Sequence, residues 1–228
     1  SKSGKWSTWS PARFPIPDKD EEFLEALRRA VKPYALRPRP GIGFYHPLLP
    51  GNKGQITCGH CQTICHPDKY VRAKRFKILA TGRQKGIKRL NLDKDKFTLL
   101  FLGGSQGAHN LNKIGVEVIQ LLNRQKKMRD EIQVIFITGE NDLEWVENSL
   151  APLKIKSLVS SYLQEIQYAY AASHLAICRS GATTIAEITA LGLPAILIPY
   201  PYATGRHQYE NARVLQAKGA AYLLVENN

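Results

Sequence analysis

Two short glycine-containing segments hold the groups best suited to chemistry. GGSQGA, at residues 103–108, follows the apolar run FTLLFL, and RSGA, at residues 179–182, follows the apolar run LAIC. In both places a predicted strand turns sharply into a predicted helix. The first turn of a helix leaves backbone N–H groups without an intrahelical partner, and the helix dipole adds positive potential there. Anions bind at such positions, so the sequence predicts a ligand that carries phosphate.

One glycine-rich loop is a weak signal, because glycines after a strand can serve only to let a helix pack closely on the sheet. Two such loops are a stronger signal when both follow strands of one sheet. Ligands of open parallel sheets bind at the carboxyl ends of the strands, where two loops can converge on one nucleotide. The prediction of a nucleotide site therefore depends on the elements that carry residues 103–108 and 179–182.

These elements alternate from residue 97 onward between apolar runs and amphipathic segments. Apolar runs indicate strands covered on both faces, and apolar residues spaced by three or four indicate helices. Strands are predicted at residues 97–102, 132–138, 155–159, 175–178, 195–199 and 220–225, and helices at 110–125, 142–150, 164–172, from 183 or 184 to about 191, and 208–218. The pattern predicts an α/β fold with a doubly wound parallel sheet.

The helix predicted after residue 181 has recognisable end signals. Thr183 or Thr184 is expected to cap its start, and Gly192 and Pro194 are expected to end it. Cys178, directly before this turn, is expected to be a buried apolar residue.

Two motifs carry a resemblance to a known family. FLGGSQGAHNLN, at residues 101–112, and CRSGATTIAEITALGLPAILIPYPYATGRHQYENA, at residues 178–212, resemble the C-terminal half of the MurG family. Members of this family are bacterial UDP-N-acetylglucosamine transferases of glycosyltransferase family 28, which complete lipid II during peptidoglycan synthesis and have the two-domain GT-B fold. The resemblance covers about residues 97–226. It implies that residues 97–228 form a Rossmann-like domain that binds UDP-GlcNAc, with lipid I as the acceptor.

The resemblance also implies roles for individual residues. Ser105 would approach the donor diphosphate, the backbone of Leu163 would read the uracil edge, and Gln208, with His207 beside it, would bond the sugar hydroxyls. A segment at the start of a helix would hold the phosphates and the ribose; its residues are Ala182, Thr183, Thr184, Ile185, Ala186 and Glu187. Glu187 would accept hydrogen bonds from the ribose hydroxyls. Taken singly, Glu187 could instead be a solvated helix residue.

Two parts of the family pattern are incomplete. In the family, the linker before this domain carries a Gly-Asn-Pro-x-Arg turn whose arginine approaches the donor; TGR at residues 81–83 lacks the Asn-Pro, which puts Arg83 in doubt. The acceptor pocket and the probable catalytic base belong to an N-terminal domain that residues 1–96 do not resemble. The catalytic residue therefore stays unassigned. One alternative is a donor subunit that docks on a membrane-bound acceptor subunit in a two-chain GlcNAc transferase.

The first part of the chain differs in charge from the rest. Residues 1–96 hold 21 Lys and Arg against 8 Asp and Glu, which equals the net charge of +13, while residues 97–228 hold 11 of each.

Residues 1–96 are expected to be irregular and basic, with one helix at 18–31. Residues 69–96 could meet an anionic membrane surface, or could simply be solvated; nucleic acid is the less favoured partner. No run of 18 apolar residues occurs, so a cytoplasmic protein, peripheral at the inner face of the plasma membrane, is expected.

Three cysteines form a possible metal site in this basic segment. Cys58, Cys61 and Cys65 have the spacing C-x2-C-x3-C, and such clusters bind a metal or an iron–sulfur cluster more often than they form disulfides inside cells. Residues of about 40–80 also resemble iron–sulfur proteins related to epoxyqueuosine reductase. Zinc is the competing interpretation, with His60 or His66 as the fourth ligand. Unligated cysteines are the third interpretation. The glycosyl transfer itself is expected to need no cofactor.

Overall fold

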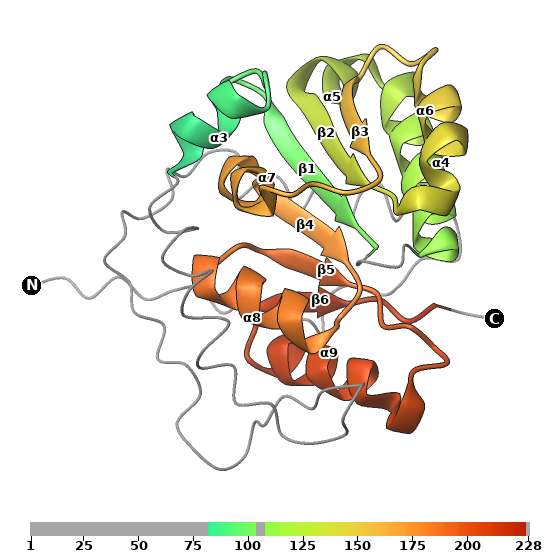
Figure 1. The fold of residues 1–228 in the computed structure, drawn as a ribbon, viewed down its shortest axis with the longest axis vertical. Helices are drawn as coiled ribbons and strands as arrows, with labels where there is room; N and C mark the ends of the chain where they lie inside the picture. The colour runs from blue at the N-terminus through green and yellow to red at the C-terminus, as the bar shows by residue number, and fades with distance from the viewer. Residues whose placement is uncertain (1–81, 104–107, 227–228) are drawn as a thin grey trace, which may run out of the picture.

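The computed structural model describes residues 82–103 and 108–226. Within these ranges, parallel strands form one sheet in the order β3-β2-β1-β4-β5-β6 (Figure 1). The strands are β1 (Phe97–Leu102), β2 (Ile132–Ile137), β3 (Lys156–Ser160), β4 (Leu175–Cys178), β5 (Ala195–Leu197) and β6 (Ala221–Leu223). The helices are α3 (Arg83–Arg89), α4 (His109–Arg124), α5 (Lys126–Glu131), α6 (Leu143–Leu150), α7 (Ile166–Ala172), α8 (Ala182–Leu191) and α9 (His207–Ala217), with short 3-10 turns at Glu140–Asp142 and Thr204–Arg206. The predicted doubly wound parallel sheet is confirmed.

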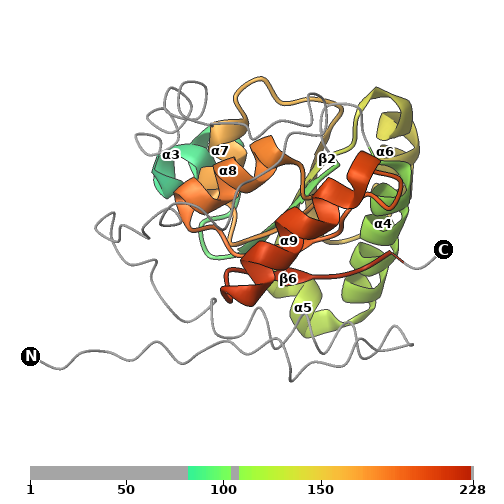
Figure 2. The same cartoon turned by 90° about the horizontal axis from the view of Figure 1, so that it is seen from below.

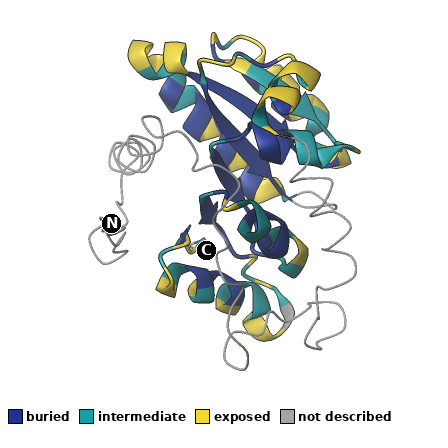
Figure 3. Cartoon of the chain, turned by 90° about the vertical axis from the view of Figure 1, so that its left-hand side faces the viewer, coloured by how far each residue is buried: buried dark blue, intermediate teal, exposed yellow. Residues whose placement is uncertain are grey.

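The central strands are apolar throughout because both faces of the sheet are covered. Every residue of β1, β2 and β4 is buried, and Figure 3 shows the sheet as the buried layer between helices whose outer surfaces are exposed. Figure 2 shows α4, α5 and α6 on one side of the sheet and α3, α7 and α8 on the other. Side chains of α9 join the core on the second side. Continuous burial on both faces is why these strands do not alternate apolar and polar residues.

Helix α8 begins differently from the prediction. Its N-cap is Gly181, and no side chain caps it, so the expected capping by Thr183 or Thr184 is wrong. Its end is as predicted: Gly192 takes a left-handed conformation with φ of 57°, which glycine adopts without strain. The helix therefore starts without a side-chain cap and ends at a glycine.

Helix α3 was not predicted, because RQKGIKR is short, basic and interrupted by a glycine. It packs on α7, and Gly86 lies at the contact. A Cβ atom at Gly86 would stand 2.6 Å from the backbone oxygen of Tyr168, so only glycine allows this approach. Leu92, which follows α3, is buried in the same core. Residues 83–92 thus pack on the sheet domain, ahead of residue 97. The helix predicted at residues 18–31 lies outside the described residues.

Candidate functional site

The two glycine-containing segments leave the sheet side by side. Strands β1 and β4 are neighbours in the sheet, and their last residues, Leu102 and Cys178, are paired in the register. Beyond β1 the strand order continues to β2 and β3, whereas beyond β4 it continues to β5 and β6. This reversal makes the space between β1 and β4 the topological switch point, where open parallel sheets bind their ligands. Ser105 lies outside the described residues, so its place in the site stays a prediction.

The start of α8 offers backbone donors at this edge. Gly181 is extended, with φ of −63° and ψ of 149°, and its carbonyl accepts the first helical bond, from the N–H of Ile185 at 2.9 Å. The N–H groups of Ala182, Thr183 and Thr184 precede that bond and cannot have an intrahelical partner. Thr183 is exposed, and Ala182 and Thr184 are half-buried, whereas Ile185 and Ala186 are buried in the core. Within the predicted segment, residues 182–184 are therefore more accessible than the residues that follow them.

Hydrogen bonds tie the start of α9 to the turn after β4. The Ser180 hydroxyl donates to the backbone oxygen of Gln208 at 2.8 Å, and the Asn211 amide donates to the backbone oxygen of Ser180 at 3.2 Å. The side-chain oxygen of Gln208 accepts a bond from the N–H of Tyr200 at 3.0 Å. Gln208, with His207 beside it, is thereby held at the edge that carries Gly181. Asn211 is buried, and its bond to Ser180 gives it a structural role.

Arg179 is a buried residue at this edge that the sequence analysis did not single out. Its Nη1 donates to the carbonyl oxygens of Ile198 at 3.1 Å and Pro199 at 3.2 Å, and to the carboxylate of Glu226 at 2.6 Å. The side chain therefore joins the ends of β4 and β5 to the segment after β6. A signal was available, because an arginine that directly follows a buried strand needs partners at the strand end.

Glu187 is buried, so the interpretation of it as a solvated helix residue is wrong. Its Oε2 accepts a hydrogen bond of 2.7 Å from the Tyr170 hydroxyl. Burial, and then the charge of Glu187, raise the pKa of the Tyr170 hydroxyl well above its usual value. Cys178 is fully buried, as predicted, and burial followed by the charge of Glu187 raises the pKa of its thiol to about 12. A buried carboxylate needs hydrogen-bond partners, and the Tyr170 hydroxyl is one of them.

Leu163 and Arg83 lie at opposite edges of the sheet. Leu163 is part of the connection from β3 to α7, at the carboxyl edge, and it packs on the core beside α7 and α8. The Nη1 of Arg83 donates to the backbone oxygen of Ala172 at 2.7 Å and lies 3.4 Å from Nδ1 of His174. Ala172 and His174 directly precede β4 and thus mark the amino edge. The structure does not bring Arg83 to the other candidate residues.

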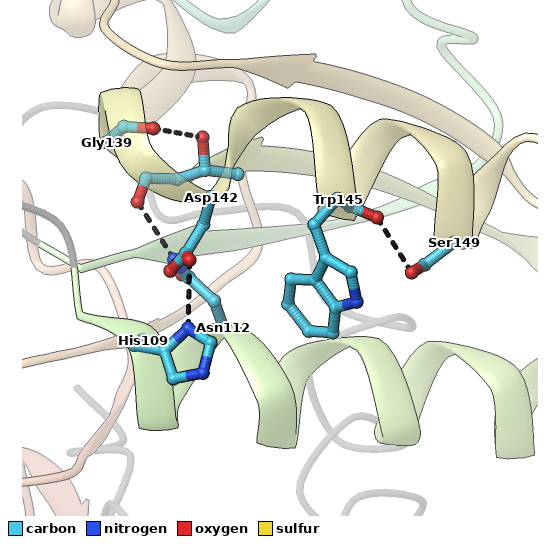
Figure 4. Close-up of polar contacts among 7 residues, drawn as sticks. His109, Asn112, Gly139, Asp142, Trp145 and Ser149 are labelled. Carbon is cyan, nitrogen blue, oxygen red and sulfur yellow. Dashed lines mark hydrogen bonds and ion pairs between the residues drawn. The ribbon is translucent and has the colours of Figure 1, made fainter.

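A polar cluster joins α4 to the end of β2 at the carboxyl edge (Figure 4). Nδ1 of His109 lies 2.8 Å from Oδ1 of Asp142. The Asn112 amide donates to Oδ2 of Asp142 at 2.7 Å and to the backbone oxygen of Thr138 at 2.8 Å. These bonds fix the first turn of α4, which follows the glycine-rich loop. No group of three or more His, Cys, Asp or Glu side chains within 82–103 and 108–226 could hold a metal; Cys58, Cys61 and Cys65 lie outside these ranges.

Comparison with known proteins identifies the class first. The glycosyltransferase family 28 C-terminal domain matches residues 98–228. The chain therefore belongs to glycosyltransferase family 28, and the predicted resemblance is confirmed.

Several similar curated proteins share the name UDP-N-acetylglucosamine--N-acetylmuramyl-(pentapeptide) pyrophosphoryl-undecaprenol N-acetylglucosamine transferase. The one from Halothermothrix orenii is 43% identical over 159 residues, which cover 67% of this chain and 42% of that protein. The one from Thermodesulfovibrio yellowstonii is 40% identical over 152 residues, which cover 67% of this chain and 41% of that protein. This chain thus spans about two fifths of the length of these relatives.

A solved structure agrees with the fold. The crystal structure of Acinetobacter baumannii MurG aligns with a TM-score of 0.50 and 27% identity, over 61% of this chain and 39% of that one. In the part of the chain that the structure describes, no helix has the length and apolar character needed to span a membrane.

Proposed function

We propose that this chain supplies the UDP-GlcNAc-binding part of a MurG-type N-acetylglucosaminyltransferase. The observation that carries the proposal is the pairing of Leu102 with Cys178, from which the two family motifs leave adjacent strands. The names of the relatives indicate the donor, a UDP-activated GlcNAc, and the acceptor, the undecaprenyl-pyrophosphoryl muramyl pentapeptide called lipid I. The whole reaction is transfer of GlcNAc to lipid I in peptidoglycan synthesis.

The proposed donor site follows from the groups at the carboxyl edge. The N–H groups of residues 182–184 bind the diphosphate, together with Ser105 of the glycine-rich loop. The backbone of Leu163 reads the uracil edge, and Glu187 accepts bonds from the ribose hydroxyls. Because the oxygen of Gln208 is held by the N–H of Tyr200, its amide nitrogen is the group that meets the sugar hydroxyls. Arg83 has no part in this site.

The chemistry that this half contributes is stabilisation of the leaving group. The acceptor hydroxyl attacks C1 of GlcNAc with inversion, the bond from C1 to the phosphate oxygen breaks, and UDP leaves with its negative charge increased. Backbone N–H groups and the dipole of α8 stabilise that charge without a metal ion. The base that takes the acceptor proton belongs to the acceptor-binding part of the enzyme, which the sequence described here does not cover.

The expected setting is the cytoplasmic face of the plasma membrane, where lipid I presents its headgroup. The basic residues in 69–96 supply the attraction to anionic lipid. Metal binding by Cys58, Cys61 and Cys65 is a separate proposal, and metal analysis of the purified chain tests it: bound iron or zinc that is lost on mutation of Cys61 supports it, and a metal-free folded chain contradicts it.

Calorimetric titration of the whole chain with UDP-GlcNAc tests the donor site. We expect micromolar to millimolar binding, weaker binding of UDP-glucose, and loss of binding in Glu187→Ala. Gln84→Ala, on the exposed side of α3, is the matched control, because it lies at the amino edge. Absence of UDP-GlcNAc binding by folded protein would contradict the proposal.

A further inference from the structure

A buried tyrosine holds the carboxylate of Glu187 between α7 and α8. The Tyr170 hydroxyl lies 2.7 Å from Oε2 of Glu187. Tyr170 is 1% exposed and Glu187 is 6% exposed. On α7, the neighbours Ala169, Ala171 and Ala172 are buried, so the tyrosine ring is fixed by packing on the core. Tyr170 is thus sealed in the core, whereas Glu187 keeps a small exposed fraction.

The direction of this hydrogen bond is fixed by the chemistry of its two groups. Burial keeps the Tyr170 hydroxyl protonated by raising its pKa, and an ionised carboxylate can only accept. A bond to a charged acceptor is shorter and stronger than one between neutral groups. It occupies one lone pair on Oε2, whereas a carboxylate has about four acceptor positions. The hydroxyl therefore occupies one acceptor position of Glu187 and restrains its rotamer.

Phenylalanine would fill nearly the same volume as Tyr170 in the core. The hydroxyl is the only feature that distinguishes the two, and its observed partner is the carboxylate. The consequence of the hydroxyl must therefore be sought in what Glu187 does.

We propose that Tyr170 is a positioning residue for recognition of the ribose: its hydroxyl holds Glu187 in the rotamer that accepts hydrogen bonds from the two ribose hydroxyls. This inference rests on the proposed function, in which Glu187 contacts the ribose. Tyr170 itself does not touch the nucleotide. It acts by sparing the ligand the cost of ordering the glutamate side chain, which loses several rotamers when it is fixed.

The test compares two ligands that differ only in the ribose hydroxyls. UDP and 2′,3′-dideoxy-UDP are titrated calorimetrically into the whole chain and into Tyr170→Phe. The variant should bind UDP about tenfold more weakly, the size expected for loss of one hydrogen bond to a charged group. It should bind dideoxy-UDP within about twofold of wild type, because that ligand makes no use of Glu187. A merely structural role would weaken both ligands alike.

Two further variants keep the test decisive. Tyr168→Phe removes a hydroxyl from a half-buried position of the same helix and should change neither affinity. In a Glu187→Gln background, Tyr170→Phe should have no further effect on the preference for UDP, since residues that act through one another are not additive. An unchanged affinity of Tyr170→Phe for UDP, or equal weakening of both ligands, would overturn the inference while leaving the proposed function intact. Failure of the wild-type chain to bind UDP would overturn both.

Discussion

The buried ion pair between Arg179 and Glu226 should dominate the stability of the carboxyl edge. The two side chains are 8% and 9% exposed, with Nη1 2.6 Å from the carboxylate, and the same Nη1 donates to the Ile198 and Pro199 carbonyls. Arg179→Met retains most of the volume and removes the charge. It leaves a carboxylate and two carbonyl groups buried without this donor. Breaking a buried pair in this way costs about 3–5 kcal/mol of the free energy of unfolding.

Urea unfolding followed by circular dichroism measures this cost, and the chain provides a matched control. Arg89 and Glu165 form a pair of similar geometry, with 2.8 Å between Nη2 and the carboxylate, but their side chains are 64% and 43% exposed. Exposed pairs contribute little, because solvent screens them. Arg89→Met should therefore unfold at the same urea concentration as wild type.

A double variant separates the loss of the ion-pair attraction from the cost of burying the Glu226 carboxylate without its partner. Arg179→Met with Glu226→Met removes both charges, and apolar replacement of a complete buried pair is often neutral. The double variant should be more stable than Arg179→Met alone. If Arg179→Met lowers the free energy of unfolding by less than about 1 kcal/mol, the pair is not buried in solution and the description of this edge is wrong.

Two other predictions concern the core and α3. The Cys178 thiol has an ordinary pKa of 9.0 and a folded value of about 12, so the stabilising effect of the neutral thiol is complete below pH 9 and is lost as the pH rises toward 12. Urea unfolding between these pH values should show a loss of about 1.4 kcal/mol per pH unit from this group. The slope should be smaller by that amount in Cys178→Ala, and an equal slope in the variant would contradict burial of the thiol. Gly86→Ala places a Cβ 2.6 Å from the Tyr168 oxygen, which should undock α3. Amide hydrogen exchange at residues 86–90 should then become at least about tenfold faster, with α4 unchanged, whereas unchanged exchange would show that α3 does not pack on α7 in solution.

The sheet could be predicted from the sequence because burial on both faces requires continuous runs of apolar residues. FTLLFL and IQVIFI are almost wholly apolar, and they form β1 and β2. The sequence of helix α3 has no comparable apolar pattern. Its contact with α7 depends on a missing side chain at Gly86, and the pattern of RQKGIKR alone does not show which backbone that glycine approaches.

The candidate site could be predicted only where the backbone determines it. The two glycine turns follow apolar strands, so their convergence follows from a parallel sheet. Glu187 and Arg179 are different, because their burial and their partners depend on residues far away in the chain. Tyr170 is 17 positions from Glu187, and Glu226 is 47 positions from Arg179. Arg83 was carried over from an incomplete family turn, and α3 holds it at the amino edge instead.

UDP-GlcNAc should bind at the carboxyl edge of the sheet, between the turns after β1 and β4. Amide NMR spectra of the isotope-labelled chain, titrated with UDP-GlcNAc, test this most directly. We expect progressive shifts for the amides of Gly181, Ala182, Thr183 and Leu163, with no shifts in α3. Shifts confined to α3 and the amino edge, or none at saturating ligand, would contradict it.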